Sequence, residues 1–201
     1  MTAKAISEQI IHLRLECGRR VCIRTVEQDD EERLRAGIEQ LSPRSRYLRF
    51  MSAASTPPDW IIDRLIDVDG TSHLAWGAID MDQKGKPAIG VVHAIRSERS
   101  GEMDYSVAVL DHYHEEGVAT LLTAVLLIEC NAAGIQTLHA QTVAENRPAV
   151  QFLASLGGSH KETRQAVSEF ELEVESAIDC LRRENSPPGL KTIFREMEHF
   201  L

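Results

Sequence analysis

The chain contains few aromatic residues, few cysteines and less positive than negative charge. Aromatic side chains make up 5% of its 201 residues, and its 4 cysteines are scattered without a C-x-x-C pair. This spacing argues against a zinc site and a disulfide scaffold, and it favours reduced thiols in a cytoplasmic protein. No apolar run is long enough to span a membrane, and the first residues lack a signal-peptide core. We therefore expect a cytoplasmic protein without a membrane partner.

The charge balance bears on the class of partner. Lys and Arg number 22 and Asp and Glu number 31, which gives a formal net charge of -9. A nucleic-acid partner requires a basic face, so we expect none. An acidic protein is compatible with a cationic substrate such as an amine, although net charge discriminates weakly.

The length of the chain predicts one domain with additions at both ends. We expect an N-terminal strand or hairpin extension over residues 1–19, a central domain over 20–175 and a C-terminal helical extension over 176–201. Alternation of apolar and polar residues on both sides of Gly18 predicts a hairpin within residues 11–26. Helices are predicted after Asp29 and after Thr56, which is expected to cap the second of them.

The order of the later elements predicts the sheet. Strands are predicted over residues 74–79, 88–95 and 104–110, and the short turns between them indicate an antiparallel meander. A long apolar helix over 117–133 and a strand over 137–143 follow, which is the pattern of a parallel crossover. The fold class is therefore α+β (mixed α/β), with a central, mixed, mostly antiparallel sheet of about six to seven strands flanked by helices.

Two further segments have simpler interpretations. The glutamates at 169, 171, 173 and 175 alternate with apolar residues, which indicates a strand with one solvated face and no metal site. After a Pro-Pro-Gly turn, Ile193, Phe194, Met197 and Leu201 have helical spacing. This tail is predicted either to dock on its own domain, which we favour slightly, or to contact a second subunit in a homodimer.

The junction between the 104–110 strand and the long helix is the main candidate for a binding site. A strand that enters a helix through a small-residue turn at Gly117 presents backbone N–H groups without partners, and these groups attract phosphate. Glu115 and Glu116 place two negative charges at this position. Either these carboxylates cap the N–H groups that a phosphate needs, or they point outward and leave the groups free.

Three motifs resemble the GNAT superfamily of acyl-CoA-dependent N-acetyltransferases, over about residues 21–174. The stretch Leu41–Phe50, L-S-P-R-S-R-Y-L-R-F, is similar to one in bacterial protein lysine acetyltransferase domains. His114–Ala119 resembles the pyrophosphate loop Gln/Arg-x-x-Gly-x-Gly/Ala, with His114 in place of Gln or Arg. Asn146 and Ala149 match the Asn-x-x-Ala that precedes a helix ending in Leu156-Gly157.

The resemblance implies acetyl-CoA as cosubstrate, bound without a metal. The pantetheine arm would pair with backbone groups of the 104–110 strand, and the pyrophosphate would lie on the loop. The expected cofactor-binding residues are Val107, Ala108, Val109, His114, Glu115, Glu116, Gly117, Val118, Ala119, Thr120 and Asn146. His114 would contact a phosphate only when protonated. His112 and His114 flank Tyr113, but no further ligand completes a metal site, and Tyr113 is expected to pack.

The resemblance also implies a reaction, the acetylation of an amine on a small molecule or a protein lysine. The position of the family's glutamate base is Asp104, with Glu102 in reserve, and the shorter aspartate suggests a water relay. For both residues we give almost equal weight to a structural role, in which the side chain is merely solvated in a turn or at the edge of a strand. The position of the family's tyrosine acid is Leu153, so that acid is missing. The missing tyrosine and the acidic loop leave an alternative, a non-catalytic GNAT-like module that senses a ligand or supports an assembly.

Overall fold

The structure is a computed structural model that describes residues 6, 8–50, 56–97, 100–184 and 186–201. Part of the predicted turn before the 104–110 strand, at 98–99, lies outside the described residues. The protein forms one 8-stranded sheet with the order β1-β2-β3-β4-β5-β6-β8-β7. The strands are β1 (Ile10–Arg14), β2 (Arg20–Thr25), β3 (His73–Asp80), β4 (Ala88–Arg96), β5 (Met103–Val109), β6 (Thr137–Val143), β7 (Ser159–Arg164) and β8 (Val167–Glu173).

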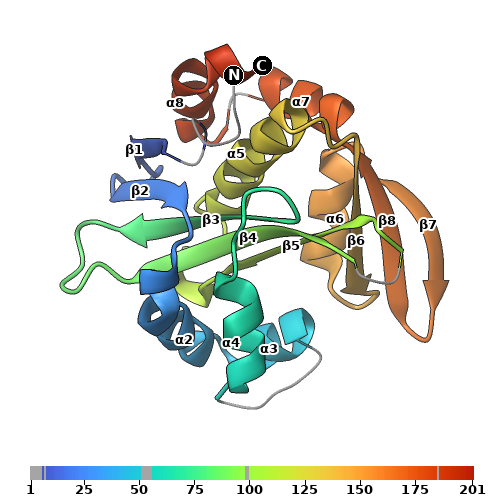
Figure 1. Ribbon diagram of the computed structural model, residues 1–201, viewed down its shortest axis with the longest axis horizontal. Helices are drawn as coiled ribbons and strands as arrows, with labels where there is room; N and C mark the ends of the chain where they lie inside the picture. Colours follow the sequence, from blue (N-terminus) through green and yellow to red (C-terminus); the bar gives the residue numbers. More distant parts are fainter. Residues whose placement is uncertain (1–5, 7, 51–55, 98–99, 185) are drawn as a thin grey trace.

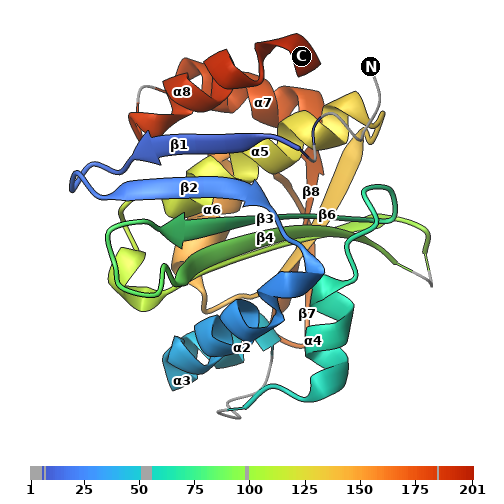
Figure 2. The same cartoon turned by 60° about the vertical axis from the view of Figure 1, so that its left-hand side comes forward.

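Helices cover both faces of this sheet. α5, α7 and α8 lie on one face, whereas α2, α3 and α4 lie on the other (Figures 1 and 2). The α-helices are α2 (Glu31–Gln40), α3 (Pro43–Phe50), α4 (Asp59–Ile66), α5 (Val118–Ala132), α6 (Arg147–Ser155), α7 (Val174–Arg183) and α8 (Gly189–Glu196). Short 3-10 helices are η1 (Gln28–Asp30), η2 (Asp111–Tyr113) and η3 (Glu198–Phe200). The mixed, mostly antiparallel α/β prediction is confirmed.

Helix α5 is apolar on all sides because it is covered on all sides. It contacts β3, β4 and β5 on one side and α7 and α8 on the other. Its residues from Leu121 to Leu127 are at most 1% exposed. A helix in this position needs no polar face, which explains the continuous apolar sequence. The buried helix therefore fixes the position of its own N-terminus relative to the sheet.

The sheet opens between β5 and β6. These two strands are parallel and pair only at Asp104 with His139 and at Tyr105 with Ala140. Beyond this point β5 continues along β4 as far as Val109, and β6 continues along β8 as far as Val143. The edge of β5 that faces β6 therefore has no strand partner from Ser106 onward among the described residues.

Several local predictions are borne out or corrected. The N-terminal hairpin is confirmed, with Leu13 paired to Val21. Thr56 does not cap the second predicted helix, because α4 begins at Asp59 after Pro58, whose carbonyl accepts a hydrogen bond from the N–H of Ile61. Strand β7 was not predicted, since its sequence S-H-K-E-T-R is polar and lies at the sheet edge.

The C-terminal tail docks on its own domain. Ile193 and Met197 are each 0% exposed, and α8 contacts α5 and β1. The interpretation that we favoured for this tail is therefore confirmed for these residues.

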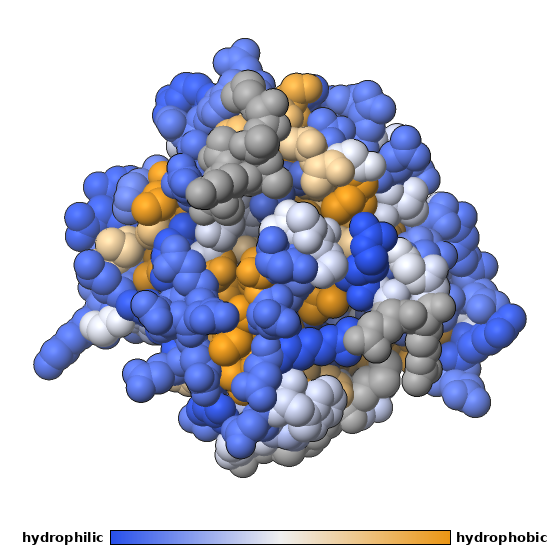
Figure 3. Space-filling model, in the orientation of Figure 1, coloured by the Kyte–Doolittle hydropathy of each residue, from blue (hydrophilic) through white to orange (hydrophobic). Residues whose placement is uncertain are grey.

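Elsewhere, hydrophilic residues cover most of the face shown in Figure 3, and hydrophobic residues reach it only in patches. No helix in the described part of the chain is long and apolar enough to cross a membrane.

Candidate active site

A cavity of about 760 Å³ lies where β5 and β6 separate. Its walls come from β5, β6, the first turn of α5, helix α3, helix α6 and the segment before α8. The lining includes Tyr105–Val109, Ala140–Thr142, Gly117–Thr120, Arg44, Ser45, Arg49, Asn146, Phe152, Leu153, Ser186 and Pro187. Segments far apart in the sequence thus meet in one site because the sheet opens there.

The N-terminus of α5 forms one end of the cavity. Gly117 is its N-cap residue and has a left-handed backbone with φ of 78°, and Glu115 also has a positive φ of 68°. No side chain accepts a hydrogen bond from the N–H groups of Val118, Ala119 or Thr120 among the described residues. Such N–H groups, together with the helix dipole, form a site for an anion.

The two loop glutamates lie apart from these N–H groups. Glu116 accepts a long hydrogen bond of 3.4 Å at Oε2 from the backbone N–H of Cys17, in the β1–β2 turn. Glu115 is exposed and lines the cavity. His114 Nε2 lies 3.1 Å from the carbonyl oxygen of Val109, so this nitrogen is the donor and the ring is turned toward β5. Neither carboxylate caps α5.

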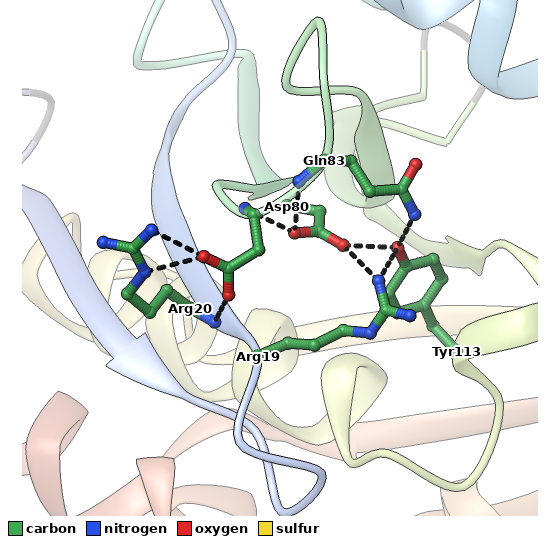
Figure 4. A network of polar contacts seen from close by, with 6 residues as sticks. Arg19, Arg20, Asp80, Gln83 and Tyr113 are labelled. Carbon is green, nitrogen blue, oxygen red and sulfur yellow. Dashed lines mark hydrogen bonds and ion pairs between the residues drawn. The ribbon is translucent and has the colours of Figure 1, made fainter.

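A polar network around the buried Asp80 holds the loop that precedes α5. The Tyr113 hydroxyl donates to Asp80 at 2.6 Å, and Arg19 pairs with the same carboxylate at 2.9 Å (Figure 4). Gln83 donates to the Tyr113 oxygen at 2.7 Å. Burial and the adjacent Asp80 raise the pKa of Tyr113 to about 12. Tyr113 therefore packs, as predicted, and it also ties the loop to the ends of β2 and β3.

Helix α3 is attached to the same loop. The Asp111 carboxylate accepts hydrogen bonds from the Ser42 N–H and from the hydroxyls of Ser42 and Ser45. Despite burial, these bonds lower the pKa of Asp111 to about 2. The L-S-P-R-S stretch thus forms the start of a helix that Asp111 holds against the cavity. Arg44, exposed on this helix, lines the cavity near the loop.

The same helix brings Arg49 to the point where the strands separate. Its Nη2 donates to the Ser106 hydroxyl at 2.8 Å. Ser106 lies opposite His93 on β4, which is 1% exposed. His93 Nδ1 lies 2.9 Å from His73 Nε2, and His73 Nδ1 lies 2.9 Å from the Asp67 carbonyl. His73 and His93 are thus buried residues of the neighbouring strands β3 and β4.

Asp104 lies just beyond this end of the cavity. It is exposed on β5, in register with His139 of β6, and Tyr105 is the next residue and lines the cavity. Asp104 and Ser106 share one face of β5, about 7 Å apart, because side chains alternate along a strand. Burial raises the pKa of Asp104, opposed by His139 and Arg64. Glu102 lies 3.7 Å from His139.

The remaining predicted positions lie in helix α6. Asn146 caps this helix, and its side-chain oxygen accepts from the N–H of Ala149 at 3.4 Å. Leu153 is 4% exposed and lines the cavity without a polar group. No three His, Cys, Asp or Glu side chains in the described part of the chain are grouped to bind a metal.

Comparisons with known proteins identify the family of this chain. Residues 20–159 match the family of the acetyltransferase (GNAT) domain. The chain belongs to the GNAT acetyltransferase family. It is 26% identical to acetyltransferase PA5475 of Pseudomonas aeruginosa over 143 residues, 71% of this chain and 77% of that protein. It is 25% identical to acetyltransferase Pat of Mycolicibacterium smegmatis over 152 residues, 73% of this chain but only 44% of that longer protein.

Solved structures share the fold of this GNAT protein. The GNAT domain of S. lividans PAT superposes with a TM-score of 0.74 at 22% identity, covering 82% of this chain and 96% of that chain. A spermidine N-acetyltransferase from Vibrio cholerae, in complex with CoA and spermine, superposes with a TM-score of 0.60 at 13% identity, covering 79% and 98%. The protein is thus an acyltransferase of the GNAT family.

Four site residues were not predicted from the sequence. Arg44, Arg49, Ser106 and Pro187 line the cavity, but none stands in a motif position with an assigned role. The signal for the two arginines was present, because both belong to the L-S-P-R-S-R-Y-L-R-F stretch. Its length indicated the family, but only the Asp111 contact shows which face of the helix meets the cavity.

Proposed function

We propose that the protein transfers an acetyl group from acetyl-CoA to a primary amine, by direct attack of the amine on the thioester. The acceptor is a small amine or a protein lysine. The observation that carries this proposal is the single cavity between the uncapped N-terminus of α5 and the last β5–β6 pair at Tyr105. Its volume of about 760 Å³ is in the range of a cofactor site. The CoA complex of the Vibrio cholerae neighbour supports the same cosubstrate.

The two ends of the cavity give acetyl-CoA a direction. The pyrophosphate lies at Gly117–Thr120, where backbone N–H groups and the helix dipole favour an anion. Arg44 supplies the cation that the loop itself lacks, since Glu115 and Glu116 occupy the loop positions. The pantetheine arm extends along Val107–Val109, whose free edge offers hydrogen bonds in the manner of an added strand. The thioester then lies near Ser106, where β5 and β6 separate.

Asp104 is the proposed general base. The incoming amine must lose a proton to attack the carbonyl carbon, and a carboxylate with a raised pKa is a better proton acceptor. Asp104 lies outside the cavity lining by one residue, so a water molecule between Asp104 and the amine carries the proton. Glu102 lies one residue before β5 begins and is the alternative acceptor.

Two measurements test the proposal. Calorimetry with acetyl-CoA measures binding, and release of the free CoA thiol with a panel of amines measures turnover. Asp104→Asn is expected to reduce turnover by about 10²–10⁴-fold, with acetyl-CoA affinity unchanged. A loss of turnover in Glu102→Gln instead would assign the base to Glu102. No heat at millimolar acetyl-CoA would refute the proposed cosubstrate. Binding without turnover on any amine would favour the ligand-sensing alternative.

A further inference from the structure

Arg49 is a half-buried cation for which the described residues supply no counter-ion. It lines the cavity, and burial lowers its pKa to about 10, so it remains charged near neutral pH. No carboxylate forms an ion pair with it in the described part of the chain, where its polar partner is the neutral Ser106 hydroxyl. The Phe50 ring, 4.9 Å from the guanidinium carbon, adds only a π-face. A half-buried cation that lines a cavity without a carboxylate partner is placed to pair with an anion that enters the cavity.

The buried pair of His73 and His93 supplies no negative charge to Arg49. The Asp67 carbonyl can only accept, so His73 donates from Nδ1 and must accept at Nε2 from His93 Nδ1. Burial lowers the pKa of His93 well below its usual range, so the ring is neutral with a bare lone pair at Nε2, and this atom has no partner among the described residues. Arg49 is close enough to lower the pKa of His93 further. The two histidines thus add no negative charge beside Arg49.

The proposed direction of acetyl-CoA places Arg49 at the reacting end. Arg49 contacts Ser106, one residue after the last β5–β6 pair, and the pyrophosphate end lies at the opposite side of the cavity. Transfer of the acetyl group generates a negative charge there, first on the carbonyl oxygen and then on the CoA sulfur. A preorganised cation at this position stabilises such a charge.

No tyrosine is placed to protonate the sulfur instead. The chain has 3 tyrosines. Tyr105 lines the cavity, but its hydroxyl lies 2.7 Å from Thr123 Oγ1 in the interior. Tyr113 donates to Asp80, and Tyr47 is 44% exposed on α3. The aligned position in α6 is the apolar Leu153.

We propose that Arg49 stabilises the CoA thiolate as it leaves, in place of a general acid. This inference rests on the proposed function. The amine nitrogen forms a bond to the carbonyl carbon, its proton passes through water to Asp104, and the carbonyl π pair moves to oxygen. When the C=O bond re-forms, the C–S bond breaks and its electron pair leaves on sulfur. The thiolate pairs with the guanidinium and is later protonated by solvent.

The test measures the thiol of bound CoA rather than turnover alone. The pH dependence of thiolate absorbance is recorded for the protein saturated with CoA, and the complex with desulfo-CoA is subtracted to remove protein cysteines. In the wild type, the pKa of the bound thiol is expected to lie about one to two units below the ordinary thiol value of about 8.5. Arg49→Met abolishes the shift, and Arg49→Lys retains part of it.

Turnover and a second arginine provide the controls. Arg49→Met is expected to lower kcat about 10- to 1000-fold, with little change in affinity for desulfo-CoA. Arg44→Met, on the same helix, weakens CoA binding but leaves the thiol shift intact. A CoA thiol with no shift in the wild type, or a shift lost equally in both variants, would overturn the role of Arg49 alone. Absence of CoA binding would overturn this inference together with the proposed function.

Discussion

The Asp111 carboxylate holds Ser42 twice, through the backbone N–H at 3.0 Å and through the hydroxyl at 2.8 Å. Ser42 also accepts from the N–H of Ser45 at 3.1 Å and so caps the start of α3. Asp111 lies six residues before Gly117 in the chain. One carboxylate therefore positions both the helix that carries Arg44 and Arg49 and the loop that enters α5.

Replacing Asp111 by Ala is expected to loosen this attachment. Hydrogen bonds to a charged group contribute about 1.5–3 kcal/mol, so the free energy of unfolding should fall by about 2 kcal/mol at pH 7. Because the folded-state pKa is lowered to about 2, the contribution is present above pH 3.8 and is lost as the pH falls toward 2. Urea unfolding at pH 7 and pH 3 measures both effects. Asp82→Ala, at an exposed ion pair with Arg20, should change stability much less than Asp111→Ala does.

Gly117→Ala is expected to damage the phosphate end of the cavity. A Cβ at Gly117 would lie 2.5 Å from Pro187, and the φ of 78° is unfavourable for alanine. We expect a loss of about 2 kcal/mol in stability and a weaker affinity for acetyl-CoA. Gly134→Ala is the matched control, because its φ is 74° but no atom lies within 4 Å. Equal effects of both substitutions on acetyl-CoA binding would contradict the role of the Pro187 contact.

The sequence predicted the elements whose patterns are local. The antiparallel strands, the continuous apolar helix and the Asn146 cap follow from alternation, helical spacing and capping chemistry within a few residues. Strand β7 escaped prediction because an edge strand with a polar sequence has no period-two apolar signal. The cap at Thr56 failed because the Pro58 carbonyl already accepts hydrogen bonds from α4.

The candidate site was predictable only in part for a related reason. The loop at Gly117 was recognisable because its chemistry lies in the backbone and needs a glycine at one position. Arg49 and Ser106 are 57 residues apart and meet only after α3 docks on the sheet. The attachment of α3 to Asp111 and the lack of a carboxylate partner for Arg49 among the described residues both depend on tertiary structure. Local sequence patterns do not predict such contacts.

The Trp76–Glu129 pair is predicted to give the protein a stability that falls with rising pH. The Trp76 indole donates to the Glu129 carboxylate at 2.7 Å in the interior between β3 and α5. Burial raises the pKa of Glu129 to about 7. Above the ordinary value of about 4.3 the unfolded chain releases this proton before the folded protein does, so unfolding becomes easier up to about pH 7.

Glu129→Gln is expected to remove this dependence while it keeps an oxygen acceptor for the indole. The variant should be more stable than the wild type at pH 8, by an amount on the order of 2 kcal/mol, and similar to it at pH 4. Denaturant unfolding at the two values measures the difference. Glu145→Gln, on the exposed turn before Asn146, serves as the control and should show no such gain. A variant that is less stable than the wild type at pH 8 would show that the carboxylate has a partner beyond Trp76.

The His73–His93 pair is predicted to have the opposite effect at lower pH. Burial lowers the pKa of both rings, and Arg49 acts in the same direction on His93, whereas Asp67 and Asp69 raise and Arg64 lowers that of His73. Below the ordinary pKa of about 6.5, the two histidines bind protons in the unfolded chain but stay neutral in the folded protein. The free energy of unfolding therefore falls as the pH falls.

Nitrogen-15 NMR and one substitution test this pair. We expect His93 to show the tautomer with hydrogen on Nδ1 and to remain neutral below pH 6.5. His93→Gln should flatten the decline in unfolding free energy below pH 6.5, whereas His112→Gln should leave it unchanged. A proton on His93 Nε2 in the neutral ring would contradict the order of donors from Asp67 through His73. It would also require a donor to the Asp67 carbonyl other than His73 Nδ1, because two adjacent rings cannot both accept along one hydrogen bond.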